Sequence, residues 1–149
     1  MLPLYDSDLP RHRFPIVTLC LVALNALVFL YALKLGGTDR AIFYYKYGLI
    51  PWELTNGENL LAYVVKPGDI DTPFSNWATI FTAMFIHGDW LHFVGNMLFL
   101  WVFGCNIESR FSPAPFLLFY LVTGLAATWM QIAIDTQSQV PLIGASGAI

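Results

Sequence analysis

The chain has 149 residues, of which 57% are hydrophobic and only 11% are charged, and its formal net charge is -3. An ordinary soluble domain has a smaller apolar share and about 25% charged residues. A nucleic-acid-binding module is excluded, because lysine and arginine do not form the basic stripe that phosphate binding requires. The composition instead favours a protein embedded in a lipid bilayer.

Three stretches without a charged residue follow one another along the chain, at 14–33, 90–107 and 115–134. The length of each stretch is close to that of a membrane-spanning helix, which needs about 20 apolar residues to cross a hydrocarbon core of roughly 30 Å. Buried helices of a soluble protein are the competing interpretation, but they would leave little polar surface to face water. A cleaved signal peptide competes only for the first stretch, which is longer than the usual apolar core and precedes no small-residue cleavage site.

A fourth apolar stretch begins at Val140 and continues to residue 149. We therefore predict an all-α fold, a polytopic membrane helical bundle with three complete spans plus the start of a fourth. Residues 1–13 are expected to form an N-terminal segment, and residues 14–149 a membrane domain that includes a first loop at 34–89. We expect this domain to be truncated on its C-terminal side, because the fourth stretch is still apolar where the chain stops.

Orientation follows from the arginines that flank the predicted spans. Arg11 and Arg13 precede the first span and Arg110 follows the second, so the positive-inside rule puts all three in the cytoplasm. The first loop also contains lysines, but a loop of this length reports poorly on topology. We expect a multi-pass protein of the cell (inner) membrane with a cytoplasmic N-terminus.

The first loop is unusually rich in aromatic residues. These are Phe43, Tyr44, Tyr45, Tyr47, Trp52 and Tyr63. Two interpretations remain open, because such rings favour the lipid headgroup region but also suit the core of a small folded cap outside the membrane. The apolar run at 77–86 is too short to span a bilayer, so we expect it to lie at the interface or to dip into it.

The two cysteines indicate neither a disulfide nor a metal site. Cys20 and Cys105 both lie inside predicted spans, and neither has a neighbouring cysteine. Reduced core residues are the expected state. No Cys/His spacing resembles a zinc site, so we predict no metal and no cofactor.

Four polar residues converge on one face of the predicted bundle. Alternation of three spans brings the start of the second span, with His87, His92 and Asn96, to the same face as Ser146. Asn96 lies six residues after Trp90 and Ser146 six residues after Val140, so we expect both about 9 Å into their helices, at about 1.5 Å per residue. His92 and Asn96 are also four residues apart, which stacks them on one side of a helix.

These residue types suit acyl transfer. A serine hydroxyl needs a base to take its proton, and the tetrahedral intermediate needs donors aimed at its oxyanion. Asn96 offers a neutral amide donor, and Gly144 and Gly147 would let a substrate backbone approach Ser146. Two simpler interpretations remain open: the polar side chains are hydrogen-bonding glue between helices, and the small residues form a close-packing patch.

Four stretches then match a known pattern in the same order. They read FTAMFIHGDWLHFVGN at 81–96, FGCNIE at 103–108, FY with a later glycine at 119–124, and GASGAI at 144–149. At these residues the chain resembles the rhomboid family of intramembrane serine proteases. The resemblance covers residues 74–149 and stops just after the nucleophile motif, while the tract before it fits the family's first span and long first loop less distinctively.

The resemblance implies a bundle of six or more spans, with a water-filled cavity open to the outer face, that cleaves transmembrane protein substrates. Ser146 would be the nucleophile, and Asn96 and His92 would bind the oxyanion with the Ser146 backbone N–H. His87 would support the mouth of the cavity. The family's base is a histidine on a later span, which would complete a Ser-His dyad from beyond this chain. We therefore expect negligible activity from the 149 residues alone.

Two features depart from the family pattern. A Trp-Arg pair often found in the first loop is absent, and residues 112–115 read Ser-Pro-Ala-Pro where many relatives have a glycine. Neither change touches the predicted site. The alternative function is a catalytically inactive rhomboid-like protein that binds transmembrane helices, although Ser146 in its small-residue setting argues against it. A transporter or channel fragment would be expected to have charged intramembrane residues, which the complete spans lack.

Overall fold

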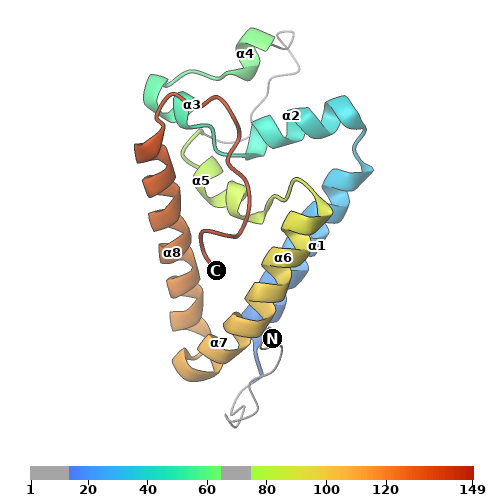
Figure 1. Ribbon diagram of the computed structural model, residues 1–149, viewed down its shortest axis with the longest axis vertical. Helices are drawn as coiled ribbons and strands as arrows, with labels where there is room; N and C mark the ends of the chain where they lie inside the picture. Colours follow the sequence, from blue (N-terminus) through green and yellow to red (C-terminus); the bar gives the residue numbers. More distant parts are fainter. Residues whose placement is uncertain (1–13, 65–74) are drawn as a thin grey trace.

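The computed structural model describes residues 14–64 and 75–149, and the regular elements of this part are all helical. Three helices are long and apolar enough to cross a membrane. They are α1 (Ile16–Lys34), the continuous helix made of α6 (Trp90–Phe99), the π-helical η2 (Leu100–Gly104) and α7 (Cys105–Phe111), and α8 (Pro113–Ile134) (Figure 1). The predicted all-α bundle with three spans is confirmed. The predicted N-terminal segment 1–13 lies outside the described residues.

The start of α1 is capped by a side chain from the second span. Its own N-cap is Pro15, which offers no capping side chain, although the first N–H groups of a helix have no intrahelical partner. Glu108 Oε1 accepts a hydrogen bond from the Val17 N–H at 2.9 Å. Its Oε2 accepts from the Thr18 N–H and the Thr18 hydroxyl, each at 2.8 Å. The buried Glu108 carboxylate thus ties the start of the first span to the end of the second.

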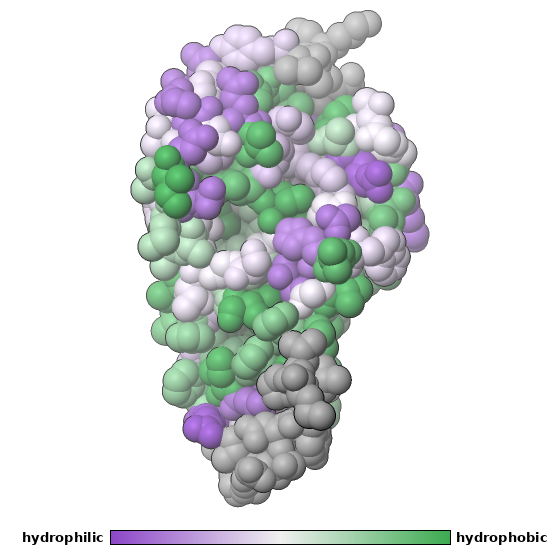
Figure 2. All heavy atoms as spheres, viewed as in Figure 1, coloured by the Kyte–Doolittle hydropathy of each residue, from purple (hydrophilic) through white to green (hydrophobic). Residues whose placement is uncertain are grey.

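The three spans bury one shared apolar cluster. Its buried members are Leu21, Met84, Met97, Leu100, Phe116, Tyr120 and Ala148. The outward faces are apolar as well, since Leu27 is 66% exposed and Leu118 is 63% exposed. In the lower half of Figure 2, hydrophobic side chains cover most of the surface that is not drawn in grey. Polar side chains gather toward the other end, which holds α2 to α4. This distribution fits helices that face lipid rather than water.

The first loop folds into short helices. They are α2 (Gly37–Tyr47), α3 (Pro51–Asn56), α4 (Leu61–Val64), α5 (Thr79–Thr82) and the 3-10 helix η1 (Ala83–Phe85). Figure 1 shows α2, α3 and α4 at the end of the bundle away from α7. The aromatic rings pack on one another, with centroids 5.0 Å apart for Phe43 and Tyr47 and 6.3 Å apart for Trp52 and Tyr63. The described part of the loop is therefore folded, but none of the six rings is buried, so the headgroup and cap interpretations both stay predictions.

The short apolar run at 77–86 is buried on one side only, since Trp77 is 58% and Phe81 is 47% exposed. Its helix α5 contacts α8, and Ile80 and Met84 are buried. Ile80 packs in a second apolar cluster with Leu49 of the first loop. The buried side of this run therefore packs against both the first loop and α8.

The expected helical start of a fourth span is not present, because residues 140–149 form a bridge and a turn instead. The Leu142 N–H donates to Leu49 O at 2.7 Å, and the Gly144 N–H donates to Ala83 O at 2.9 Å. The two acceptors lie outside residues 140–149, so the N–H groups of Leu142 and Gly144 do not make the hydrogen bonds of a helix. Gly144 also has a φ of 123°, which a helix cannot include. The prediction of equal helical depth for Asn96 and Ser146 was therefore wrong.

Replacing Glu108 tests whether its cap supports the bundle. In Glu108→Gln the amide nitrogen would face N–H donors, so at least one buried hydrogen bond is lost and the free energy of unfolding should fall by about 1–3 kcal/mol. Thermal unfolding in detergent measures the change, and Asp39→Asn, at an exposed carboxylate, is the matched control. Equal unfolding temperatures for the two variants would contradict the assigned role of Glu108.

Candidate functional site

The site begins at the turn that starts α6. Asp89 is the N-cap of this helix, and its carboxylate accepts a hydrogen bond from the His92 N–H at 2.9 Å. Asp is a preferred N-cap residue because it satisfies one of the free donors of the first turn. The cap fixes where the helix begins and therefore puts His92 in its first turn and Asn96 one turn further.

His87 and Asn96 form a direct polar contact. Asn96 Nδ2 lies 3.0 Å from His87 Nε2, and His87 is completely buried. The His92 ring packs edge-on against His87, with centroids 5.0 Å apart. Burial, followed by the charge of His92, lowers the pKa of His87 to about 4. His87 is therefore neutral at pH 7, and its Nε2 can accept a hydrogen bond from the Asn96 amide.

Residues 140–149, here called the serine segment, contact these side chains through Gly144. A Cβ at Gly144 would lie 2.5 Å from His92 Nε2 and 3.6 Å from Asn96 Nδ2. Only a residue without a side chain fits so close to the His92 ring, and the positive φ favours glycine as well. The contact brings Gly144 against His92 and Asn96, with Ser146 two positions further along the chain.

Gly147 holds the other side of the segment against α8. A Cβ at Gly147 would lie 2.7 Å from the Ala127 Cβ, and one at Gly124 would lie 3.2 Å from the Ala148 Cβ. The two glycines of the motif thus face His92 and Ala127 of the protein itself. This geometry gives both glycines a packing role, and the approach of a substrate backbone at Gly144 and Gly147 stays a prediction.

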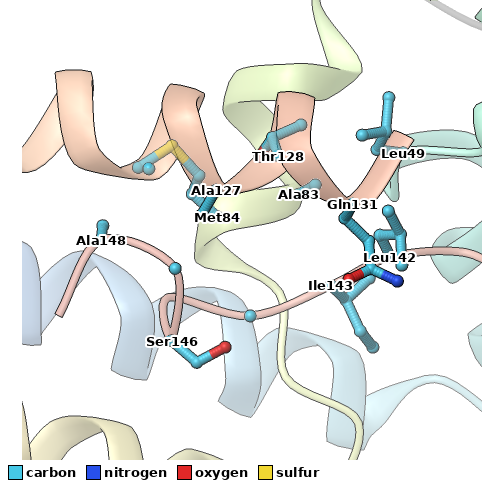
Figure 3. A pocket seen from close by; sticks show the side chains of 13 residues that line it. Leu49, Ala83, Met84, Ala127, Thr128, Gln131, Leu142, Ile143, Ser146 and Ala148 are labelled. Carbon is cyan, nitrogen blue, oxygen red and sulfur yellow. The ribbon is translucent and has the colours of Figure 1, made fainter. Parts of the chain in front are cut away.

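Ser146 itself is exposed, between the buried Ala145 and the buried Ala148. A cavity of about 200 Å³ lies between this segment and α8, lined by Ser146, Gly144, Met84 and Gln131 among others (Figure 3). In the part of the chain that the structure describes, no hydrogen bond joins the Ser146 hydroxyl to a histidine. The structure therefore brings His87, His92, Asn96 and Gly144 together, whereas Ser146, two residues after Gly144, lines the cavity toward α8.

Three residues near the site were not predicted from the sequence. The Tyr44 hydroxyl donates to His87 O at 3.3 Å, and burial raises the pKa of Tyr44. Gln131 lines the cavity from α8, and Leu49 pairs with Leu142. Gln131 carried a signal, because a glutamine inside an apolar span is uncommon. Tyr44 and Leu49 carried none, since their contacts are with residues remote in the sequence.

Fold and hydropathy together define this chain as a multi-pass integral membrane protein. The family model for the Rhomboid domain matches residues 75–149, which is half of the chain. The chain belongs to the rhomboid family.

Three curated relatives from Arabidopsis thaliana are similar to the chain. Identity is 34% over 76 residues with Rhomboid-like protein 11, chloroplastic (51% of this chain, 27% of that protein), and 30% over 73 residues with RHOMBOID-like protein 5 (49% and 23%). It is 33% over 78 residues with RHOMBOID-like protein 6, mitochondrial (49% and 25%). The matches thus span about a quarter of these relatives. No solved structure matches the chain.

The lowered pKa of His87 predicts a specific loss of stability in acid. An unfolded histidine titrates near pH 6.5, so the stability that comes from keeping His87 neutral is complete above about pH 6.5 and is lost as the pH falls toward about 4. His87→Gln keeps an acceptor for Asn96 but cannot titrate. Between about pH 6.5 and 4.5 the unfolding temperature of the parent should therefore fall more steeply than that of this variant. Parallel curves over this range would contradict the assignment.

Proposed function

We propose that the complete protein is an intramembrane serine endopeptidase in which Ser146 is the nucleophile. The observation that carries the proposal is the close contact of Gly144 with His92 and Asn96. Gly144 packs on a polar cluster at the start of a membrane-spanning helix, and the exposed Ser146 follows it by two residues. A buried polar cluster at such a position is costly in hydrocarbon and more often serves a function.

The oxyanion would be bound by Asn96, His92 and the Ser146 backbone N–H. An asparagine amide has two N–H donors, and the contact with His87 Nε2 uses one of them. The second N–H, for which the described part of the chain shows no hydrogen bond, would stabilise negative charge on the carbonyl oxygen of the substrate. Neutral His87 thereby acts as a positioning residue, because it fixes the orientation of the Asn96 amide without adding a charge.

The reaction would follow the usual course of acyl transfer. The Ser146 Oγ attacks the scissile carbonyl carbon while a histidine from beyond residue 149 takes the hydroxyl proton. The same histidine returns the proton to the leaving amine as the peptide bond breaks, and water then hydrolyses the acyl-enzyme. The substrates would be transmembrane protein segments, because the site is built on membrane-spanning helices. The protein would lie in the cell (inner) membrane with its N-terminus on the cytoplasmic side.

Ser146→Ala in the complete protein is the direct test. Cleavage of a model transmembrane substrate and covalent labelling by a fluorophosphonate should both fall to background, because the attacking oxygen is removed. A variant that cleaves as fast as the parent would exclude Ser146 as the nucleophile. A parent that is folded but neither cleaves nor labels would favour the alternative of an inactive rhomboid-like protein that binds transmembrane helices.

Asn96→Ala separates an oxyanion donor from a structural hydrogen bond. Loss of one donor from an oxyanion hole lowers kcat by about 10²- to 10³-fold, whereas an interhelical hydrogen bond contributes only about 0.6 kcal/mol to stability. We expect the large loss in kcat with little change in KM. Asn106→Ala, in the same span but near its other end, is the matched control. Equal kinetics for the two variants would remove Asn96 from the oxyanion site.

A further inference from the structure

The first loop is joined directly to the segment that leads to Ser146. The Leu49 N–H donates to Leu142 O at 3.1 Å and the Leu142 N–H donates back to Leu49 O at 2.7 Å, which forms an isolated antiparallel bridge. Two more hydrogen bonds extend the connection, from the Trp52 N–H to Ser138 O and from the Thr55 hydroxyl to Thr136 O, both at 3.1 Å. The serine segment is therefore held by the first loop as well as by the spans.

Gly48 makes this approach possible. The residue is buried at the end of α2, and a Cβ there would lie 2.5 Å from Tyr44 O and 3.0 Å from both the Pro141 Cβ and the Ile143 Cγ2. Its φ is -75°, so the reason for glycine is space rather than backbone strain. A larger residue would clash with Tyr44 O at the end of α2 and would also have to push residues 141–143 away.

The attachment at Leu49 is buried in an apolar cluster. Leu49 is 1% exposed and packs with Ile80, Ala83 and Ile132, which come from α5, η1 and α8. Residues 142 and 144 are thus fixed on opposite sides, by Leu49 of the first loop and by His92 of α6. Ser146 follows within two residues of the second attachment.

We propose that Gly48 and Leu49 are positioning residues for Ser146, an inference that rests on the proposed peptidase function. They hold residues 141–144 at the distance from α6 that aligns the nucleophile with Asn96 and His92. The first loop is then part of the active-site framework and not only a cap. Misplacement of a reacting group by about 1 Å can cost about 10²-fold in rate, so a displaced segment should slow chemistry more than binding.

The first test compares two Gly→Ala variants of the complete protein in the same loop. Gly48→Ala should lower kcat and the rate of fluorophosphonate labelling of Ser146 by at least about 10-fold, with KM within about two-fold of the parent. Gly36→Ala is the matched control, because no atom lies within 4 Å of its added Cβ, and it should leave both rates within about two-fold. Parent-like labelling in Gly48→Ala would overturn the inference.

A second test does not depend on the folding of Gly48→Ala. A mutually hydrogen-bonded antiparallel pair has Cα atoms about 5.5 Å apart, which suits a disulfide. Leu49→Cys with Leu142→Cys, in a background without other cysteines, should therefore crosslink under mild oxidation. The oxidised protein should label at Ser146 at least as fast as the same protein after reduction. A crosslinked protein that loses labelling by about 10-fold would show that the two segments must separate, and would overturn the inference.

The two proposals fail in different ways. If Ser146→Ala labels as strongly as the parent, the proposed peptidase function is wrong. If Ser146→Ala abolishes labelling while either Gly48→Ala or the oxidised crosslink behaves contrary to expectation, the function stands and only the positioning role of Gly48 and Leu49 is rejected.

Discussion

The structure depends on the hydrogen bonds that Glu108 accepts from the start of α1. Helix starts have free N–H groups, and in an apolar setting each unsatisfied group is costly. Since Pro15 supplies no cap, the second span provides one, with three bonds of 2.8 to 2.9 Å. At the other end of α1, Phe29 stacks on Phe93 of α6 with centroids 4.4 Å apart. The two contacts fix α1 against the second span, and Phe93 in turn borders His87.

The site resolves a conflict between polar chemistry and an apolar surrounding. The Asn96 amide pairs with His87 Nε2, and the low pKa of His87 keeps the ring uncharged at neutral pH. Small residues then bring the serine segment close from two sides, Gly144 against His92 and Gly147 against Ala127. Packing and the proposed chemistry therefore require the same glycines, and the two interpretations left open by the sequence are not exclusive.

The sequence predicted the spans and the members of the polar cluster because both depend on short-range patterns. Uncharged stretches of span length mark the helices, and the four-residue spacing of His92 and Asn96 puts them on one side of α6. The prediction of a helix from Val140 was wrong because apolar composition does not distinguish a helix from a buried irregular segment. Its backbone hydrogen bonds go to Leu49 and Ala83, and no local pattern around Val140 reveals those partners.

By itself the sequence determined that the chain is an all-helical, multi-pass membrane protein whose second span begins with polar side chains. In hydrocarbon a long apolar helix is stable whatever its neighbours are, because it satisfies its own backbone hydrogen bonds. Only the tertiary structure decided how the serine is held. Glu108 caps a residue 91 positions away, and the first loop pairs with Leu142 through contacts between distant parts of the chain. Such contacts depend on the space left when helices pack, which no local stretch of sequence encodes.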